Sequence, residues 1–231
     1  MAGRSRTPEV DRLHQVYEGY DADESARARW SLDNAGNRAI HAERARRAGV
    51  VLSGAVGPVL DLGCGGGQVL VELDRALPTD GLRVGVDLRA ARLSVAADAA
   101  PGAGFARAEG SALPFPDATF GLVLAFTLFS SILDEAAARA VATELGRVLR
   151  PAGRVLWYDL RRPNPSNDAV RPLAPAEIEA LFPGWTASLR PLTVLPPLAR
   201  RLGPATDALY PRLARVRPLT THLLGTVTKP A

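Results

Sequence analysis

The chain has 231 residues and a formal net charge of +4, with 47% hydrophobic and 23% charged residues. This size and balance are typical of one large α/β domain with added helices. A single cysteine, Cys64, excludes an internal disulfide and a cysteine-rich zinc site, and we predict no metal site.

The basic residues are almost all arginines and occur in short groups, such as Arg44, Arg46 and Arg47. No long basic block or aromatic-interleaved stretch is present, so we interpret them as solvated helix faces and predict no nucleic-acid partner. The first 12 residues lack the apolar region of a signal peptide, and the apolar stretch 122–133 is too short to span a bilayer. We therefore expect no membrane partner and a cytoplasmic location.

The N-terminal quarter is expected to be partly irregular. Residues 1–12 contain few apolar groups, and we predict them to be disordered or loosely docked. The spacing of apolar and aromatic residues over 13–20 predicts a short helix, whereas 21–34 is polar and broken. A longer helix is expected from about 37 to 51.

From residue 58 onward, strands alternate with helices, which is the pattern of a parallel sheet. Strands are predicted at 58–62, 82–87, 104–107, 119–126 and 153–160, with helices starting at 69 and spanning 89–99 and 134–150. Prolines exclude regular structure at 161–167. Beyond that loop we predict a helix at 175–182, a strand at 186–195, one or two helices within 198–215, and a last strand at 222–228.

The turn after the first strand is rich in glycine and indicates a bound ligand. Glycines at 63 and 65–67 permit positive φ and close approach of a ligand. Gln68 stands where a dinucleotide-binding turn requires its third glycine, and no Gly-Lys-Ser/Thr follows, so a phosphate-binding P-loop is excluded. Asp61 precedes the first glycine by two residues, where its carboxylate could bind the cationic amine of an amino-acid moiety.

Four motifs in order resemble those of the class I S-adenosylmethionine-dependent methyltransferases. They are Asp-Leu-Gly-Cys-Gly-Gly-Gly at 61–67, Gly-Val-Asp-Leu at 85–88, Glu-Gly-Ser-Ala-Leu-Pro-Phe-Pro-Asp-Ala-Thr-Phe at 109–120, and Leu-Gly-Arg-Val-Leu-Arg-Pro-Ala-Gly at 145–153. Ser111 departs from the family, which has an aspartate there. The stretches at 157–165 and 219–225 further resemble a bacterial branch of the family that acts on small molecules such as natural products or sugars.

This resemblance implies the fold, the cofactor and the cofactor site. The fold would be a doubly wound, Rossmann-like α/β sheet of about seven strands, mostly parallel with an antiparallel last strand, and with helices on both faces. The cofactor would be S-adenosyl-L-methionine, released as S-adenosyl-L-homocysteine. Asp87 would bind the ribose hydroxyls. The full expected cofactor set is Tyr20, Arg29, Asp61, Gly63, Cys64, Gly65, Gln68, Asp87, Leu88, Gly110, Ser111, Ala112, Phe126 and Thr127.

Residues 1–54 are then expected to form a helical lid, and residues 55–231 the cofactor-binding domain, with 161–217 carrying insertions on the substrate side. Candidate catalytic residues are Asp159, Tyr158 and His41. Candidate substrate-binding residues are Tyr17, Trp30, Asn164, Asn167 and His222. Simpler structural roles stay open for three residues: Asp87 as a helix cap, Phe126 as core, and Asp159 as a loop cap.

The expected reaction is methyl transfer to a small-molecule acceptor, in the first place to a hydroxyl. Alternatives left open are N- or C-methylation and a scaffold role for the cofactor, for example in a cyclisation. A nucleic-acid methyltransferase is disfavoured because strand four ends Ala-Phe-Thr-Leu at 125–128, without the Asn/Asp-Pro-Pro-aromatic sequence of that class. A dinucleotide-dependent reductase is disfavoured by Gln68. The sequence does not decide the oligomeric state.

Overall fold

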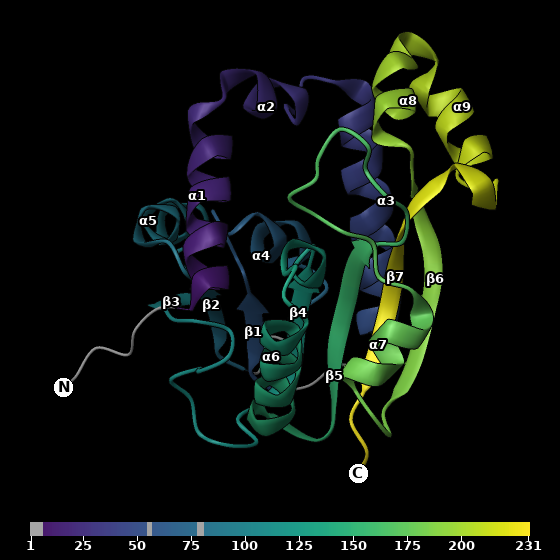
Figure 1. Cartoon of the computed structure of the whole chain (residues 1–231). Helices are drawn as coiled ribbons and strands as arrows, with labels where there is room; N and C mark the ends of the chain where they lie inside the picture. The colour runs from purple at the N-terminus through teal and green to yellow at the C-terminus, as the bar shows by residue number, and fades with distance from the viewer. Residues whose placement is uncertain (1–6, 55–56, 78–80) are drawn as a thin grey trace.

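A computed structural model of the chain describes residues 7–54, 57–77 and 81–231. It contains a seven-stranded sheet in the order β3-β2-β1-β4-β5-β7-β6, with helices on both faces (Figure 1). The strands are β1 (Val59–Leu62), β2 (Arg83–Asp87), β3 (Gly104–Arg107), β4 (Phe120–Phe126), β5 (Leu149–Leu160), β6 (Thr186–Val194) and β7 (Thr220–Thr228). β7 runs antiparallel to both of its neighbours, β5 and β6, and the other strand pairs of the sheet are parallel. The predicted fold class, including the antiparallel last strand, is confirmed.

The helices are α1 (Pro8–Ala22), α2 (Glu24–Arg29), α3 (Ala35–Leu52), α4 (Gln68–Leu73), α5 (Ala90–Ala99), α6 (Glu135–Val148), α7 (Pro175–Leu181), α8 (Pro196–Arg201) and α9 (Thr206–Leu213). No helix in the described ranges combines the length and the apolar composition needed to cross a bilayer.

Alternation along β1 decides which side chains face which helices. Leu60 and Leu62 belong to the core cluster that includes α6 and α7. Val59 belongs to the opposite cluster, which includes α3 and α4, and Asp61 shares its face. β1 pairs with β2 on one side and with β4 on the other, so the strand order reverses between β1 and β4. Such a switch point leaves a crevice at the carboxyl ends of the strands, where α/β proteins bind their ligands.

Three differences from the sequence-based expectation exceed two residues. Residues 8–12 are not loose but form the start of α1, where Pro8 is in the first turn and the Thr7 hydroxyl accepts a hydrogen bond from the Val10 N–H. Residues 1–6 lie outside the described residues. The segment predicted to be broken contains α2. The fifth strand begins at Leu149, four residues early, because Leu149 already pairs with Phe120 before an irregularity in the ladder.

The N-terminal helices occupy two different places. α1 and α2 lie at the carboxyl ends of the strands, whereas α3 runs along the sheet beside α4 (Figure 1). Buried Ile40, Ala48 and Leu52 face inward from α3, and a Cβ on Gly36 would lie only 2.1 Å from the Ala199 carbonyl oxygen in α8. The division at residue 54 therefore stays a prediction, since α3 contributes to the core.

Candidate functional site

The glycine turn between β1 and α4 takes a backbone conformation that favours glycine. Gly63, Gly65 and Gly67 have φ values of 75°, 50° and 77°. A Cβ on Gly67 would lie 3.1 Å from the Ala96 Cα, whereas a Cβ on Gly65 would have no neighbour within 4 Å. The turn is thus closely packed beneath and open above Gly65, which leaves room for a ligand.

The Asp87 carboxylate lies beside this open turn. Its Oδ2 accepts a hydrogen bond of 2.9 Å from the Gly65 N–H, and its Oδ1 accepts one of 2.9 Å from the Arg89 N–H. Arg89 is the N-cap of α5, so Asp87 contributes to the start of that helix without being its cap. Each carboxylate oxygen retains acceptor capacity. Asp87 can therefore bind two hydroxyl groups and hold the turn at the same time.

Asp61 is a buried carboxylate with an unsatisfied oxygen. The residue is 1% exposed, and its Oδ2 has no hydrogen-bond partner among the described residues. Burial and repulsion by Asp87 raise its pKa to about 7, and attraction to Arg44 offsets part of this. A buried, unpartnered carboxylate is costly. A cationic group supplied by a ligand would satisfy it.

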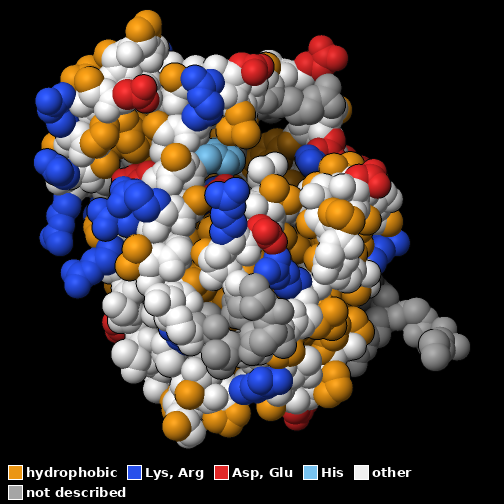
Figure 2. Space-filling view, turned by 180° about the vertical axis from the view of Figure 1, so that it is seen from behind, with side chains coloured by type: hydrophobic (Ala, Val, Ile, Leu, Met, Phe, Trp, Pro, Cys, Tyr) orange, Lys and Arg blue, Asp and Glu red, His pale blue; other side chains and the backbone are white. Residues whose placement is uncertain are grey.

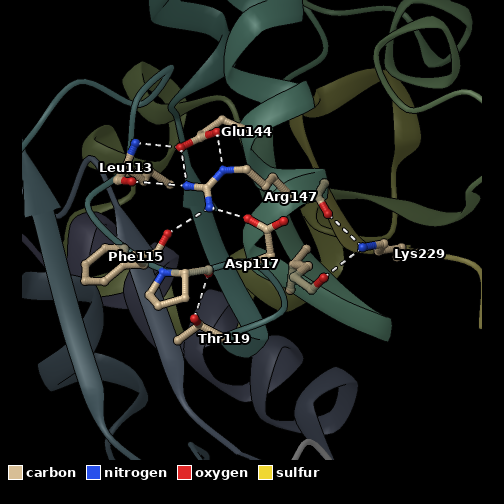
Figure 3. A network of polar contacts seen from close by, with 10 residues as sticks. Leu113, Phe115, Asp117, Thr119, Glu144, Arg147 and Lys229 are labelled. Atoms are coloured by element: carbon tan, nitrogen blue, oxygen red, sulfur yellow. Dashed lines mark hydrogen bonds and ion pairs between the residues drawn. The ribbon is translucent and has the colours of Figure 1, made fainter.

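The loop after β3 is held by a polar network from α6, shown in Figure 3. The Leu113 N–H donates to Glu144, and Arg147 donates to the carbonyl oxygens of Leu113 and Phe115 and to the Asp117 carboxylate. The ion pair with Arg147 lowers the pKa of Glu144. The network joins the motif at 109–120 to the motif at 145–153. It fixes the loop in which Ser111 lies two residues before Leu113.

A cavity of about 820 Å³ extends from the glycine turn to the underside of α1. We name it the α1 cavity. Its walls come from α1, the ends of β1, β2 and β4, the loop after β3, and α6. Nine residues predicted from the sequence line it: Tyr17, Gly63, Gly65, Asp87, Leu88, Gly110, Ser111, Phe126 and Thr127. Nine predicted residues from five separate segments are thus brought together around one space.

Polar contacts hold α1 over this cavity. The Tyr17 hydroxyl lies 2.9 Å from the Ser131 Oγ, and Arg12 donates to the Ser131 carbonyl oxygen. Arg89 donates to the Tyr17 carbonyl oxygen and pairs with Asp21. The expectation of an N-terminal cover places Tyr17 here, but Arg12 and Ser131 were not predicted, since only the folded chain brings them together.

The part of the α1 cavity between α1 and α6 is mainly apolar. Its walls include Val10, Leu13, Leu128, Ile132, Ala136, Ala137, Ala140 and Val141, with His14 and Asp134 among them. Thr127, at the end of β4, has a φ of 49°, which is unusual for a β-branched residue, and its N–H donates to the Tyr158 carbonyl oxygen. The space beyond Thr127 suits an apolar small molecule.

None of the three candidate catalytic residues lines the α1 cavity. Asp159 is buried, its oxygens accept from the N–H groups of Ser130 and Leu160, and burial raises its pKa to about 6. The Tyr158 hydroxyl lies 2.8 Å from the Thr193 hydroxyl, and burial raises its pKa. His41 pairs with Glu72 on α4. A general base must reach the proton that it removes, so their catalytic role stays a prediction.

Six predicted cofactor residues, the buried Asp61 among them, lie outside the cavity walls. Cys64 is buried beneath the turn, where burial raises the pKa of its thiol. Gln68 and Ala112 are exposed. The Tyr20 hydroxyl donates to Asn167 in the loop after β5. Arg29 is exposed and pairs with Asp23 at 3.6 Å. The structure does not bring Arg29 to the glycine turn.

The remaining predicted substrate residues are also dispersed. Trp30 is 53% exposed and packs against the Arg200 guanidinium, 5.1 Å from its ring centroid. Asn164 is exposed, and its side chain accepts from the Ser166 N–H. His222 is buried and stacks on Tyr158 at 4.6 Å, and burial lowers its pKa to about 3. His222 is therefore neutral at physiological pH.

Arg44, which the sequence analysis placed on a solvated face, has a side chain that is only 13% exposed. Its Nε donates to Glu72 at 2.8 Å, and its guanidinium lies 5.5 Å from the Phe126 ring and 5.2 Å from the Tyr158 ring. Ile40, Arg44, Ala48 and Leu52 follow one another at intervals of four residues, so they share a helix face. That spacing was the signal that could have placed Arg44 inside.

Residues 59–153 match the family described as "Methyltransferase domain". The chain is 34% identical over 166 residues to a demethylmenaquinone methyltransferase of Roseiflexus castenholzii, covering 70% of this chain and 62% of that protein. It is 35% identical over 111 residues to a 2-phytyl-1,4-naphtoquinone methyltransferase of Synechococcus elongatus, covering 46% of each. The chain thus spans less than two thirds of these relatives.

Solved structures share the fold at low identity. A geranyl diphosphate methyltransferase in complex with geranyl diphosphate and sinefungin matches with a TM-score of 0.67 and 16% identity, over 97% of this chain and 100% of that one. The PH0226 protein of Pyrococcus horikoshii matches with a TM-score of 0.62 and 17% identity, over 93% and 99%. The [4+2]-cyclase SpnF matches with a TM-score of 0.55 and 18% identity, over 80% and 81%. These likenesses establish the fold alone.

Proposed function

We propose that this chain, which carries a methyltransferase-family domain at residues 59–153 on a class I S-adenosylmethionine-dependent methyltransferase fold, methylates a small, largely apolar acceptor. S-adenosylmethionine is the methyl donor, and the acceptor binds in the α1 cavity. The observation that carries the proposal is the pair of carboxylates beside the open glycine turn. Asp61 has an unsatisfied buried oxygen, and Asp87 keeps free acceptor capacity.

The residues present fit an aminoacyl nucleoside. Asp61 would take the amino group, since a cation is what its buried Oδ2 lacks. Asp87 would accept from the two ribose hydroxyls, and Leu88, Gly110 and Ser111 would surround the adenine. Ser111 presents a hydroxyl where the family has a carboxylate, so it can accept a hydrogen bond from the adenine amino group but not a charge-assisted one.

The cofactor supplies an electrophilic methyl group on a sulfonium, a good leaving group. The chain's contribution is alignment of the acceptor with that methyl group, and proximity and orientation can supply roughly 7–11 kcal/mol. Phe126 and Thr127 lie at the end of β4 between the glycine turn and the apolar part of the cavity. α1, held by Tyr17 and Arg12, covers the space and limits the access of water.

The accepting atom is an oxygen or a ring carbon of a hydroxylated aromatic compound. A hydroxyl was the first expectation from the sequence. Carbon is favoured by the relatives, among which proteins of Marinomonas sp. and Geobacter sulfurreducens are described as ubiquinone/menaquinone biosynthesis C-methyltransferases, at 33% and 31% identity over about half of the chain. The apolar walls of the α1 cavity accord with an aromatic ring.

The first test is binding. S-adenosylhomocysteine at 100 times its Kd should stabilise the protein by about 2.7 kcal/mol, whereas NAD should not. The second is turnover of a naphthohydroquinone with a 13C-methyl-labelled donor, where the 13C shift of the product separates a methyl on carbon from one on oxygen. Stabilisation by NAD alone would refute the proposal. If S-adenosylhomocysteine stabilises the protein but the acceptor is converted to a product of the same mass, no methyl group has been transferred. That pair of results would favour the alternative in which the bound cofactor serves as a scaffold.

A further inference from the structure

A second cavity, of about 840 Å³, lies on the sheet face covered by α3 and shares no lining residue with the α1 cavity. α3, β6, β7 and α9 form its walls. Five arginines line it, from three separate segments: Arg46, Arg47, Arg190, Arg215 and Arg217. We name it the arginine cavity.

These arginines are not paired with carboxylates in the part of the chain that the structure describes. None of the five has an ion pair or a side-chain hydrogen bond within the described ranges, and all five are exposed. Two carboxylates also line the cavity. Glu43 is buried and accepts from the Tyr210 hydroxyl at 2.8 Å, and Asp207 is exposed. The cavity therefore carries more positive than negative charge, and its arginines repel one another unless an anion is present.

The remaining walls are mainly apolar, with Thr206, Thr220 and Tyr210 as the polar exceptions. Val50, Val51, Pro191, Leu192 and Leu224 lie among the arginines, and Val50 is 72% exposed. Figure 2 shows the same combination on the surface, where blue side chains gather on the left of this face with orange ones between them. That edge is where Figure 1 places β6 and α9. A ligand with a strong anion and a hydrocarbon part matches both kinds of wall.

We infer that the arginine cavity binds a phosphate-bearing amphiphile, with its phosphate among the arginines and its hydrocarbon part against Val50 and Leu192. Guanidinium groups bind phosphate oxygens through paired N–H donors, which makes phosphate the better match than a monodentate anion. A single-stranded nucleic acid fits less well, because it needs exposed aromatic platforms. The one aromatic residue among the lining residues, Tyr210, is buried and bonded to Glu43.

The test measures binding of decyl phosphate, below its micelle concentration, by calorimetry. Wild-type protein should bind decyl phosphate more tightly than inorganic pyrophosphate and should not bind decanol. The variant Arg46→Gln/Arg190→Gln should lose at least about tenfold in affinity, since each charged hydrogen bond contributes that much or more. Arg162→Gln/Arg201→Gln is the matched control, because it removes two exposed arginines outside the cavity. The control should bind as wild type does.

Further measurements distinguish a lipid headgroup from a free phosphate compound, and binding in the arginine cavity from binding in the α1 cavity. Vesicles of phosphatidylglycerol, compared with phosphatidylcholine, show whether a lipid headgroup serves as the phosphate, and their binding should depend on the same two arginines. Arg190→Gln alone replaces the double variant if the latter does not fold. Equal binding by the double variant and the control would overturn the inference. So would displacement of decyl phosphate by S-adenosylhomocysteine, or by an oligonucleotide more effectively than by pyrophosphate.

Discussion

Replacing Asp61 by asparagine tests both the buried carboxylate and the proposed cofactor contact. The carboxyl pKa is raised by burial from an ordinary value of 3.8 to about 7. Below pH 4 the group is protonated in the folded and the unfolded chain. Between pH 4 and pH 7 only the folded chain holds the proton, so stability from this group falls as the pH rises through that window, by up to about 4 kcal/mol.

Asp61→Asn removes this pH-dependent cost but leaves a buried amide N–H₂ group without a partner, which costs about 1–3 kcal/mol. At pH 8 the ligand-free variant should therefore be more stable than wild type by about 1–3 kcal/mol. At pH 4 it should be equal or less stable. Urea unfolding across this pH range measures both values. A variant less stable than wild type at pH 8 would refute the buried-charge explanation.

The same substitution should weaken the cofactor complex. Loss of a charge-assisted hydrogen bond of about 1.5–3 kcal/mol corresponds to a Kd for S-adenosylhomocysteine that is roughly 10- to 150-fold higher. In wild type the affinity should also fall below pH 7 as Asp61 is protonated, and this fall should be absent in the variant. Calorimetric titration between pH 5.5 and pH 8 decides the matter. An unchanged Kd would remove Asp61 from the cofactor site.

Three further substitutions test the site from other sides. Asp87→Ala should weaken the binding of S-adenosylhomocysteine by about 1–3 kcal/mol, measured by calorimetric titration. The control Asp98→Ala, at an exposed position of α5, should leave the Kd unchanged. Equal Kd values for the two variants would count against the ribose contact. Arg44→Met leaves the poorly exposed Glu72 carboxylate with the His41 imidazole but without a guanidinium, and should cost about 3–5 kcal/mol in urea unfolding. A loss under about 1 kcal/mol would show that this ion pair contributes little to stability. At pH 4, where wild-type Asp159 is neutral, Asp159→Asn should lower stability by about 1–3 kcal/mol, because a backbone N–H group loses its acceptor; at pH 8 this loss should shrink or reverse, because burial raises the pKa of Asp159 to about 6. Turnover should stay near wild type, and lost turnover at unchanged stability would instead support a base.

The sheet and the glycine turn could be predicted because their signals are local. The apolar run of β1 and the glycines that follow it dictate a buried strand and a left-handed turn, whatever surrounds them. Asp87 and Ser111 follow strands whose carboxyl ends meet at one edge of a parallel sheet, so their convergence on the α1 cavity also follows from the pattern.

The rest depends on contacts between distant segments. Arg44 and Arg46 have the same side chain, and apart from the four-residue spacing that Arg44 shares with Ile40 and Ala48, it is the packing of α3 on the sheet that covers most of one and leaves the other exposed. Tyr17 and Trp30 are both aromatic residues of the predicted N-terminal lid that could cover a ligand. The first is turned toward Ser131 and the second lies on the surface against Arg200. Tyr158 and Asp159 end the strand that borders the site, but their side chains bond below it to Thr193 and to backbone N–H groups.

The manner in which α1 is attached has a kinetic consequence. None of the described α1 residues is fully buried, and the helix is fastened by hydrogen bonds and by ion pairs such as Asp21 with Arg89 and Arg92. An element held by partly exposed ion pairs and hydrogen bonds, with no fully buried apolar residue of its own, opens at less cost than the sheet does, and mobile ions weaken its attachment. Raising the ionic strength should therefore speed amide exchange in α1 while the β4 amides stay protected. Passage of reactant and product would be set by salt rather than by the stability of the sheet.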